Sequence, residues 1–130
     1  MSKLKHGNKK ITIDGIRFDS KAEAAYYNYL KILKKSGDIK SFEMQVKYTL
    51  VDRFYHPSKT RKNGEPSIVG AITYTPDFII EENDGKKHVV DVKGHRTPVF
   101  NLKAKLFMHR YGIPLILAKR KGRGFEHTEL

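Results

Sequence analysis

The sequence of 130 residues contains no cysteine, and its longest apolar run is the short segment IPLILA. Without cysteine, disulfide bonds and thiolate metal sites are excluded, which agrees with a reducing compartment such as the cytoplasm. The apolar run is far too short to cross a bilayer, and no apolar signal segment follows the basic start MSKLKHGNKK. These absences predict a soluble, cytoplasmic protein with no membrane partner.

Two kinds of site are also missing from the sequence. The six histidines show no paired spacing of the kind that holds the metal of ββα-type nucleases. No glycine-rich phosphate loop precedes an expected helix, so a nucleotide cofactor is not expected.

Acidic residues are scarce, since 14 Asp and Glu stand against 26 Lys and Arg and the formal net charge is +12. This excess of positive charge favours a polyanionic partner. The alternative is a basic surface that only keeps the protein soluble. With 38% hydrophobic and 11% aromatic residues, the chain can bury one core, so we expect a single domain over residues 1–130.

Two segments have the caps that are typical of helices: Ser20 and Gly37 bound the first, and Thr97, Pro98 and Gly112 bound the second. Four other segments have the alternating or continuous apolar pattern of strands. The expected order is helix 20–37, strand 41–51, strand 71–82, strand 86–94, helix 97–112 and strand 113–118. Three antiparallel strands and a fourth that returns after a helix predict an α/β fold with helices flanking a mixed sheet.

Three segments rich in lysine and arginine fall outside these elements. We expect a flexible basic arm (residues 1–10), a basic loop insertion (53–70) and a basic tail (119–130), all able to reach phosphates. Phe54 and Tyr55 in the second segment can stack on an unpaired base or anchor the loop. The candidate phosphate contacts are Lys3, Lys5, Lys9, Lys10, Arg53, Lys59, Arg61, Lys62, Lys119, Arg120, Lys121 and Arg123.

One expected hairpin brings two carboxylates together. If residues 83–85 form a three-residue loop with a left-handed glycine, Glu82 pairs with Lys86. Counting back from that pair places Asp77 directly opposite Asp91 on the same face. Such side chains have Cβ atoms about 4.5–5.5 Å apart and repel one another unless a proton or a cation lies between them. The hairpin therefore predicts a site for a hard divalent cation such as Mg²⁺.

Lys93 lies two residues after Asp91 and therefore points to the same face of its strand. Its amine can orient or deprotonate a water molecule that attacks phosphorus, or stabilise the charge that develops there. The carbonyl of Val92 can add a metal ligand. The alternative is structural, with Asp91 and Lys93 forming an ion pair while Asp77 caps a turn after Pro76.

The segments TPDF and VVDVKG resemble the signature of the PD-(D/E)xK nuclease superfamily, with Pro76, Asp77, Asp91 and Lys93 at the motif positions. The order of elements is similar to the αβββαβ core of that superfamily, the restriction-endonuclease-like fold, over about residues 15–118. The resemblance implies a Mg²⁺-dependent DNA endonuclease in which Mn²⁺ can substitute. It also implies in-line attack that leaves 5′-phosphate and 3′-hydroxyl ends.

The wider pattern GIRFDSKAEAAYY, FEMQVKYTL, TPDF and DVKG is similar to small phage-encoded nucleases. That group includes Holliday-junction resolvase-like enzymes and the endonuclease subunits of some transposons. The resemblance implies a phage protein that acts on branched DNA during recombination, and paired incisions imply a homodimer. The alternatives are a transposon-type or nicking endonuclease of the same fold, or a basic nucleic-acid-binding protein without catalysis.

By the same resemblance, Glu23 on the first expected helix is a further acidic metal ligand. Its alternative role is a capping box with Ser20, because the spacing Ser-x-x-Glu also stabilises a helix N-terminus. Gln45 is a candidate supporting residue beside the site, or an ordinary solvent-facing amide.

Four further basic residues follow the site in sequence. His95 and Arg96 come directly after its last strand and are placed to contact the scissile backbone. Lys103 and Lys105 lie on the second expected helix, where they contact DNA or form a solvated face.

Overall fold

The computed structural model describes residues 10–130, and the elements named here lie within that range. Two helices and eleven strands follow one another along it. They are β1 (Ile11–Ile13), β2 (Ile16–Phe18), α1 (Lys21–Ser36), β3 (Ser41–Met44), β4 (Tyr48–Val51), β5 (Phe54–Thr60), β6 (Pro66–Val69), β7 (Ile72–Tyr74), β8 (Phe78–Glu81), β9 (Lys87–Val92), α2 (Pro98–Tyr111), β10 (Leu115–Lys121) and β11 (Gly124–Glu129).

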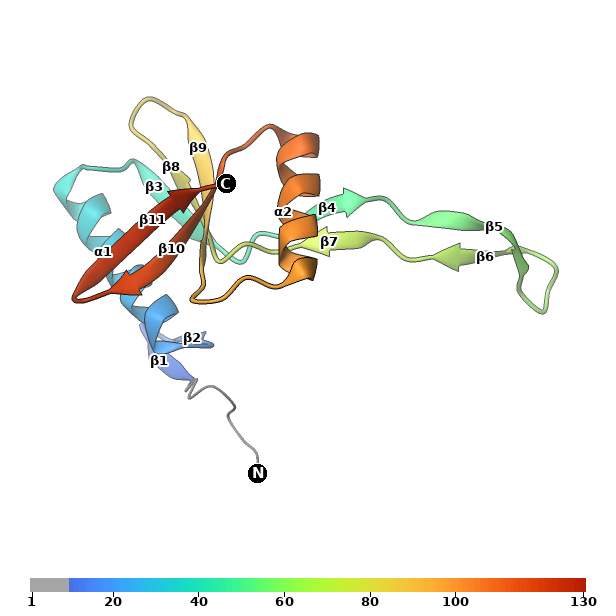
Figure 1. Ribbon diagram of the computed structural model, residues 1–130, viewed down its shortest axis with the longest axis horizontal. Coiled ribbons are helices and arrows are strands. Elements are labelled where there is room, and N and C mark those ends of the chain that lie inside the picture. The colour runs from blue at the N-terminus through green and yellow to red at the C-terminus, as the bar shows by residue number, and fades with distance from the viewer. Residues whose placement is uncertain (1–9) are drawn as a thin grey trace.

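A five-stranded sheet in the order β11-β10-β9-β8-β3 forms the centre of the molecule (Figure 1). Strands β9 and β10 are parallel, because α2 connects them, and the other neighbours are antiparallel. The expected order of helix, three strands, helix and strand is found as α1, β3, β8, β9, α2 and β10. The α/β fold with a mixed sheet and flanking helices is confirmed.

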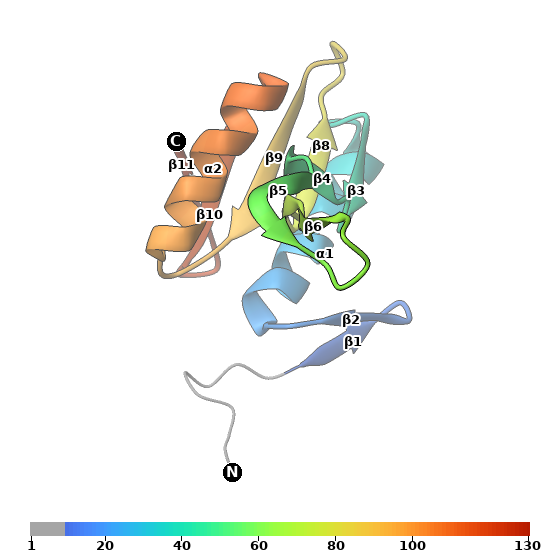
Figure 2. The same cartoon turned by 90° about the vertical axis from the view of Figure 1, so that its right-hand side faces the viewer.

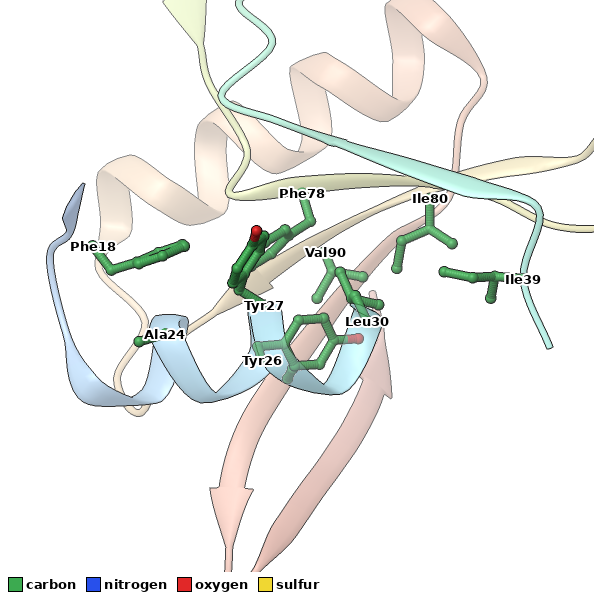
Figure 3. Packing of buried hydrophobic residues seen from close by; sticks show 10 residues of the cluster. Phe18, Ala24, Tyr26, Tyr27, Leu30, Ile39, Phe78, Ile80 and Val90 are labelled. Atoms are coloured by element: carbon green, nitrogen blue, oxygen red, sulfur yellow. The ribbon is translucent and has the colours of Figure 1, made fainter. Parts of the chain in front are cut away.

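The two helices cover opposite faces of this sheet. Phe78, Ile80 and Val90 point toward α1 and pack against Tyr26, Tyr27 and Leu30, as Figure 3 shows from close by. The intervening residues of the same strands point toward α2; they are Ile79 and Val89, which pack with Phe100, Ala104 and Phe107. Burial on both faces explains why β8 and β9 are apolar almost without interruption.

Both helices begin and end at the expected caps. The Oγ of Ser20 accepts a hydrogen bond from the backbone N–H of Glu23, and α1 ends at Gly37, whose φ is 83°. Thr97 caps α2 in the same way, Pro98 opens it, and Gly112 ends it with a φ of 65°. Left-handed glycines relieve the strain that a side chain would cause there.

The expected register of the β8–β9 hairpin is also confirmed. Phe78 faces Val90, and Glu81 faces Lys87. The N–H of Glu82 donates to the carbonyl of Lys86 at 2.8 Å, and Gly85 has a φ of 87°. These are the features of the three-residue loop from which the position of Asp77 opposite Asp91 was inferred.

Two expected strands are each divided in two, which corrects the sequence interpretation. The alternating segment 41–51 breaks after Met44, since Gln45 adopts a left-handed backbone with a φ of 58°. The segment 71–82 breaks between Tyr74 and Phe78, at the buried Pro76. Strand β3 of the first segment and strand β8 of the second stay in the sheet, where they pair with one another. The other two parts, β4 and β7, pair with one another outside it.

The expected loop insertion at residues 53–70 is instead an ordered β-structure. Strands β5 and β6 pair antiparallel, and together with β4 and β7 they form a two-stranded projection over residues 48–74, here called the ribbon. Figure 1 shows the ribbon extending far from the sheet, and Figure 2 shows its end facing the viewer. The short hairpin β1–β2 precedes α1 and turns at Asp14 and Gly15, whose φ values are 53° and 77°.

The expected basic tail at residues 119–130 is also ordered. Strand β10 continues to Lys121, and β11 returns along it to form the edge of the sheet. Phe125 of β11 packs edge-on against Tyr26 at a ring distance of 4.9 Å, and the ring of His127 lies within hydrogen-bonding distance of the same tyrosine hydroxyl. An aromatic contact that a charge pattern does not reveal therefore fixes this segment.

The expected arm falls mostly on residues 1–9, which lie outside the described residues, as do Lys3, Lys5 and Lys9. Lys10 is exposed and forms an ion pair with Asp19 at 3.4 Å. Neither helix in residues 10–130 has both the length and the apolar character required to cross a membrane.

Candidate active site

Asp77 and Asp91 lie side by side where β8 begins and β9 ends. The backbone N–H of Asp77 donates to Oδ1 of Asp91 at 2.9 Å. In return, the backbone N–H of Val92 donates to Oδ2 of Asp77 at 2.9 Å. Each carboxylate is thus held by the backbone of the opposite strand, and Asp91 is only 3% exposed. The structure brings these two residues together as the hairpin register requires.

Tyr74, which the sequence interpretation missed, is the third group in this arrangement. Its hydroxyl donates a hydrogen bond to Oδ2 of Asp91. The tyrosine is buried at the end of β7, where its ring contacts Phe100 and Phe107 of α2. Both oxygens of Asp91 therefore have a fixed donor, which holds the carboxylate in one orientation.

Glu23 approaches the same place from the first turn of α1. Its carboxylate is 8% exposed, and it lies on the wall of a pocket with a volume of about 240 Å³. Asp77 and Gln45 line the same pocket from the sheet side. The remaining lining residues are Ile16, Arg17, Phe18, Asp19, Met44 and Phe78. Arg17 and Asp19 were not among the candidate residues, although both lie in the segment GIRFDSKAEAAYY; Arg17 is in β2, and Asp19 follows it directly.

Asp77 and Glu23, which line this pocket, both have raised pKa values, and the neighbouring Asp91 contributes to each shift. Burial, followed by repulsion from Asp91 and Glu23, raises the pKa of Asp77 to about 8. Burial and the negative charges of Asp19 and Asp91 likewise raise the pKa of Glu23, although a hydrogen bond with Asp77 opposes this rise. The site therefore has more negative charge than its own surroundings neutralise, and it favours a proton or a cation between these groups.

Lys93 lies near this cluster but is not paired with Asp91. Its Nζ is 4.8 Å from the centroid of the Phe100 ring, which is a cation–π distance. Among the ion pairs of residues 10–130, none joins Lys93 to Asp91, so the ion pair of the structural alternative is not found. Its positive charge still reaches Asp77, whose pKa it lowers.

Gln45 occupies the break between β3 and β4. Its backbone N–H donates to the carbonyl of Asp77 at 3.4 Å, which ties the two breaks to one another. The residue is exposed, but it lines the pocket together with Glu23 and Asp77. It therefore lies beside the candidate site and not on the polar side of a continuous strand.

Glu23 also has a role at the start of α1, where its N–H donates to Oγ of Ser20 at 3.1 Å. This contact is one half of the capping box that the sequence allowed. The carboxylate of Glu23 accepts a backbone N–H at Asp19 and also lines the pocket, so the helix start and the pocket share this side chain.

The residues at the site suit a hard cation in chemistry, although they do not form a ready-made cage. Within residues 10–130 no group of three or more His, Asp and Glu side chains has the arrangement of a metal site. The available donors near Asp77 and Asp91 are all oxygens, the type that Mg²⁺ prefers. A carboxylate oxygen that accepts one N–H keeps a second acceptor position. The donor set therefore fits Mg²⁺ with a shell completed by water or phosphate.

The candidate DNA contacts are distributed over several surfaces. Arg53, Lys59, Arg61 and Lys62 are exposed on the ribbon, and Lys119, Arg120, Lys121 and Arg123 are exposed at the β10–β11 turn. Ala118 of β10 pairs with Val92 of β9, so the next residues, Lys119 and Lys93, lie at the same end of the sheet.

The four basic residues after β9 lie close to α2. His95 and Arg96 are exposed in the connection to this helix, where Nε of Arg96 donates to Oδ1 of Asn101 at 2.8 Å. Lys103 is half-buried on α2, and Lys105 is exposed.

Comparison with known proteins gives one match. No curated protein and no solved structure matches the chain. A family model described as "Protein of unknown function (DUF1064)" matches residues 2–118, a range that includes both carboxylate strands and the ribbon. The chain therefore belongs to the DUF1064 family.

Proposed function

We propose that the protein is a Mg²⁺-dependent DNA endonuclease that hydrolyses phosphodiester bonds, with branched DNA such as a Holliday junction as its substrate. The observation that carries this proposal is the meeting of Asp77, Asp91 and Glu23 beside a lysine, in a chain with a net charge of +12. Buried carboxylates are costly to the folded state unless a cation or a proton compensates them. A polyanionic substrate accounts for the excess of lysine and arginine.

In this proposal Asp77 and Asp91 hold the metal ion, Glu23 completes or supports its shell, and the carbonyl of Val92 adds a ligand. When bound, Mg²⁺ supplies Lewis acidity toward the phosphodiester, and Mn²⁺ supplies it less selectively. Tyr74 fixes the orientation of Asp91 through its hydroxyl group.

Lys93 handles the attacking water or the developing charge on the phosphate. In the present arrangement its amine lies over Phe100, which keeps it near the carboxylates without an ion pair. This position leaves its donors available to a substrate. Gln45 and Arg17 line the pocket where one side of the substrate backbone would pass.

One chain supplies one such site, so paired incision of a four-way junction requires two copies of the chain. The products are 5′-phosphate and 3′-hydroxyl ends. A nicking or transposon-type endonuclease would use the same residues and differ only in the DNA that it selects.

The test offers labelled four-way junctions, flaps, linear duplex, single strands and supercoiled plasmid to the purified protein in Mg²⁺. We expect cutting of the branched substrates, no cutting in EDTA, and binding without cutting in Ca²⁺. Asp91→Asn should lower the rate of incision by about a thousandfold or more and leave binding intact, because a metal ligand is lost. The matched control is Asp84→Asn, which changes an exposed carboxylate in the β8–β9 loop. Equal rates for Asp91→Asn and the wild type would refute the proposal.

A second candidate, a DNA-binding protein without catalysis, is favoured by one observation. Both oxygens of Asp91 already accept hydrogen bonds, from Tyr74 and from the backbone of Asp77. A purely structural carboxylate would have the same partners. Tight binding to the DNA panel, with no cutting in Mg²⁺ or Mn²⁺, would establish this candidate instead.

A further inference from the structure

The outer part of the ribbon has no packing partner within the described chain, unlike its base. At the base, Tyr48 packs against Phe107 at a ring distance of 5.0 Å, and the hydroxyl of Tyr111 donates to the carbonyl of Thr49 at 2.7 Å. These contacts attach β4 to α2, and Tyr74 of β7 packs against Phe107 of the same helix at a ring distance of 5.5 Å. Strands β5 and β6 continue outward beyond this anchor (Figure 1).

The outer part exposes large apolar side chains on both of its faces. Tyr55 and Ile68 face one another across the two strands and are 63% and 44% exposed. Phe54, on the other face, is 48% exposed. A two-stranded hairpin alone is only marginally stable in water. Apolar side chains on both faces of a projecting hairpin indicate a surface that a partner covers.

Cations accompany these apolar residues. Between Arg53 and Val69 the sequence has four lysines and arginines and a single acidic residue, Glu65. Lys59 and Lys62 are exposed and form no ion pair within the described residues, whereas Arg61 lies 3.9 Å from Glu65. The partner that this surface suits is therefore a polyanion with some apolar area.

Hydrogen bonds give the end of the ribbon a defined shape. Arg61 and Glu65 close the turn with a backbone bond of 2.7 Å, and Gly64 donates to Arg61 at 2.9 Å. The Nδ1 of His56 accepts the N–H groups of Ser58 and Lys59 at 3.0 and 2.9 Å, which orders the irregular part of β5. A shape formed in advance lowers the entropic cost of binding.

We propose that the outer ribbon, residues 53–69, enters a groove of duplex DNA while the carboxylate site acts on the same molecule. The major groove admits a two-stranded β-ribbon, and about eight residues in each outer strand reach roughly 27 Å, most of one turn of duplex. Lys59, Arg61 and Lys62 contact phosphates, and the apolar residues contact sugars and base edges. This inference rests on the proposed function, because it takes DNA to be the substrate.

A second copy of the chain is a less suitable occupant of the same surface. Two ribbons that met through Tyr55 and Ile68 would bring like-charged ends together, in a protein that already has a net charge of +12. Such an arrangement is electrostatically unfavourable, whereas the phosphates of DNA neutralise the positive charges of the ribbon.

The first test compares salt dependence of binding in Ca²⁺, so that cutting is not needed. The slope of log binding constant against log salt concentration is negative. For a linear duplex, the variant Lys59→Ala/Arg61→Ala/Lys62→Ala should make it less steep by about 2.7, which is about 0.9 for each lost phosphate contact. Its affinity for duplex should fall at least about tenfold, against less than about threefold for single-stranded DNA, which has no groove. The matched control, Lys34→Ala/Lys35→Ala/Lys86→Ala, removes three exposed lysines far from the ribbon in sequence and should change neither value.

An unchanged slope, or an equal loss of affinity for duplex and single strand, would overturn the proposal. The absence of cysteine allows a second test, in which Lys62→Cys carries a tethered iron–EDTA group. On a four-way junction, where the branch point fixes the position of the protein, cuts should be confined to one short stretch of an arm; cuts scattered along the arm would contradict a groove-bound ribbon. Light scattering completes the test by comparing the oligomeric state of the wild type with that of a Tyr55→Ser/Ile68→Ser variant. A dimeric wild type and a monomeric variant with unchanged DNA affinity would identify a second copy as the occupant.

These outcomes separate the ribbon from the proposed chemistry. If the wild type never cuts DNA but the ribbon variant binds duplex more weakly, the nuclease proposal is refuted and the groove contact is retained. A protein that cuts, and whose ribbon variant binds as before, refutes the groove contact alone.

Discussion

The β8–β9 and β5–β6 hairpins have the same turn but opposite surroundings. Gly85 and Gly64 have φ values of 87° and 86°. In the first turn Gly85 donates to Glu82 at 2.9 Å, and in the second Gly64 donates to Arg61 at 2.9 Å. Local sequence therefore sets the two connections alike, and the difference between the hairpins comes from what packs on them.

Helices cover the β8–β9 hairpin on both faces, whereas β5–β6 is open to solvent. Charge inside the covered hairpin is costly, so burial raises the pKa of Asp77 there. Charge on the open hairpin costs little, so lysine and arginine gather there. Burial thus divides the molecule into a covered part with buried carboxylates and an open part with exposed cations.

The largest expected effect concerns matched phenylalanines of the two hairpins. Phe78→Ala in β8 should lower the free energy of unfolding by about 3–5 kcal/mol, because the side chain is only 1% exposed and its loss leaves a cavity. Phe54→Ala in β5 should change it by less than about 0.5 kcal/mol. Urea denaturation followed by circular dichroism measures both. A similar loss for the two variants would show that the outer ribbon packs on the body.

The next effect concerns matched carboxylates and pH. The folded chain raises the pKa of Asp77 from 3.8 to about 8, so between these values the folded state retains a proton that the unfolded state has released. Stability from this group is fully present below about pH 4 and is lost as the pH rises through 8. The melting temperature in EDTA should therefore fall between pH 5 and 9, by on the order of 5–10 °C.

Asp77→Asn should flatten this pH dependence, because the asparagine does not titrate. Glu65→Gln, in the turn of the open hairpin, should leave the dependence as it is in the wild type. An Asp77→Asn variant with the full wild-type slope would assign the effect to other groups.

The smallest effect concerns matched tyrosines. Tyr74→Phe removes the hydroxyl that donates to the buried Asp91 and should cost about 1.5–3 kcal/mol of stability. If the proposed function holds, it should also slow incision at saturating DNA with little effect on binding. Tyr55→Phe, on the exposed face of β5, should change stability by less than about 0.5 kcal/mol. Indistinguishable melting curves for the two variants would contradict an orienting role for Tyr74.

The central hairpin could be predicted because its signals are local. The glycine at position 85 sets the loop, the loop sets the register, and the register places Asp77 opposite Asp91. The second hairpin has a similar signal, Asn63 followed by Gly64, but the segment around it is polar and contains two prolines. Polar strands without a buried face have no alternating pattern, so the ribbon was interpreted as a loop.

Tyr74 could not be predicted because it depends on backbone breaks. In one continuous strand, residues 74 and 77 would point to opposite faces. The break at Pro76 brings the hydroxyl of Tyr74 to the carboxylate that pairs with Asp77. The break at Gln45 is hidden in the same way, since the apolar alternation continues through it. Such breaks are tertiary features, and the local pattern does not report them.

The positions of these two breaks have a consequence for how the protein can change. Gln45 and the carbonyl of Asp77 meet where both strands leave the sheet, and β4 and β7 then pack on α2. The residues between Val51 and Ile72 form an appendage beyond the level of this packing. Adding or deleting residue pairs beyond that level leaves the spacing of the carboxylates as it is. The appendage can therefore be lengthened or trimmed while the residues around Asp77 and Asp91 keep their places.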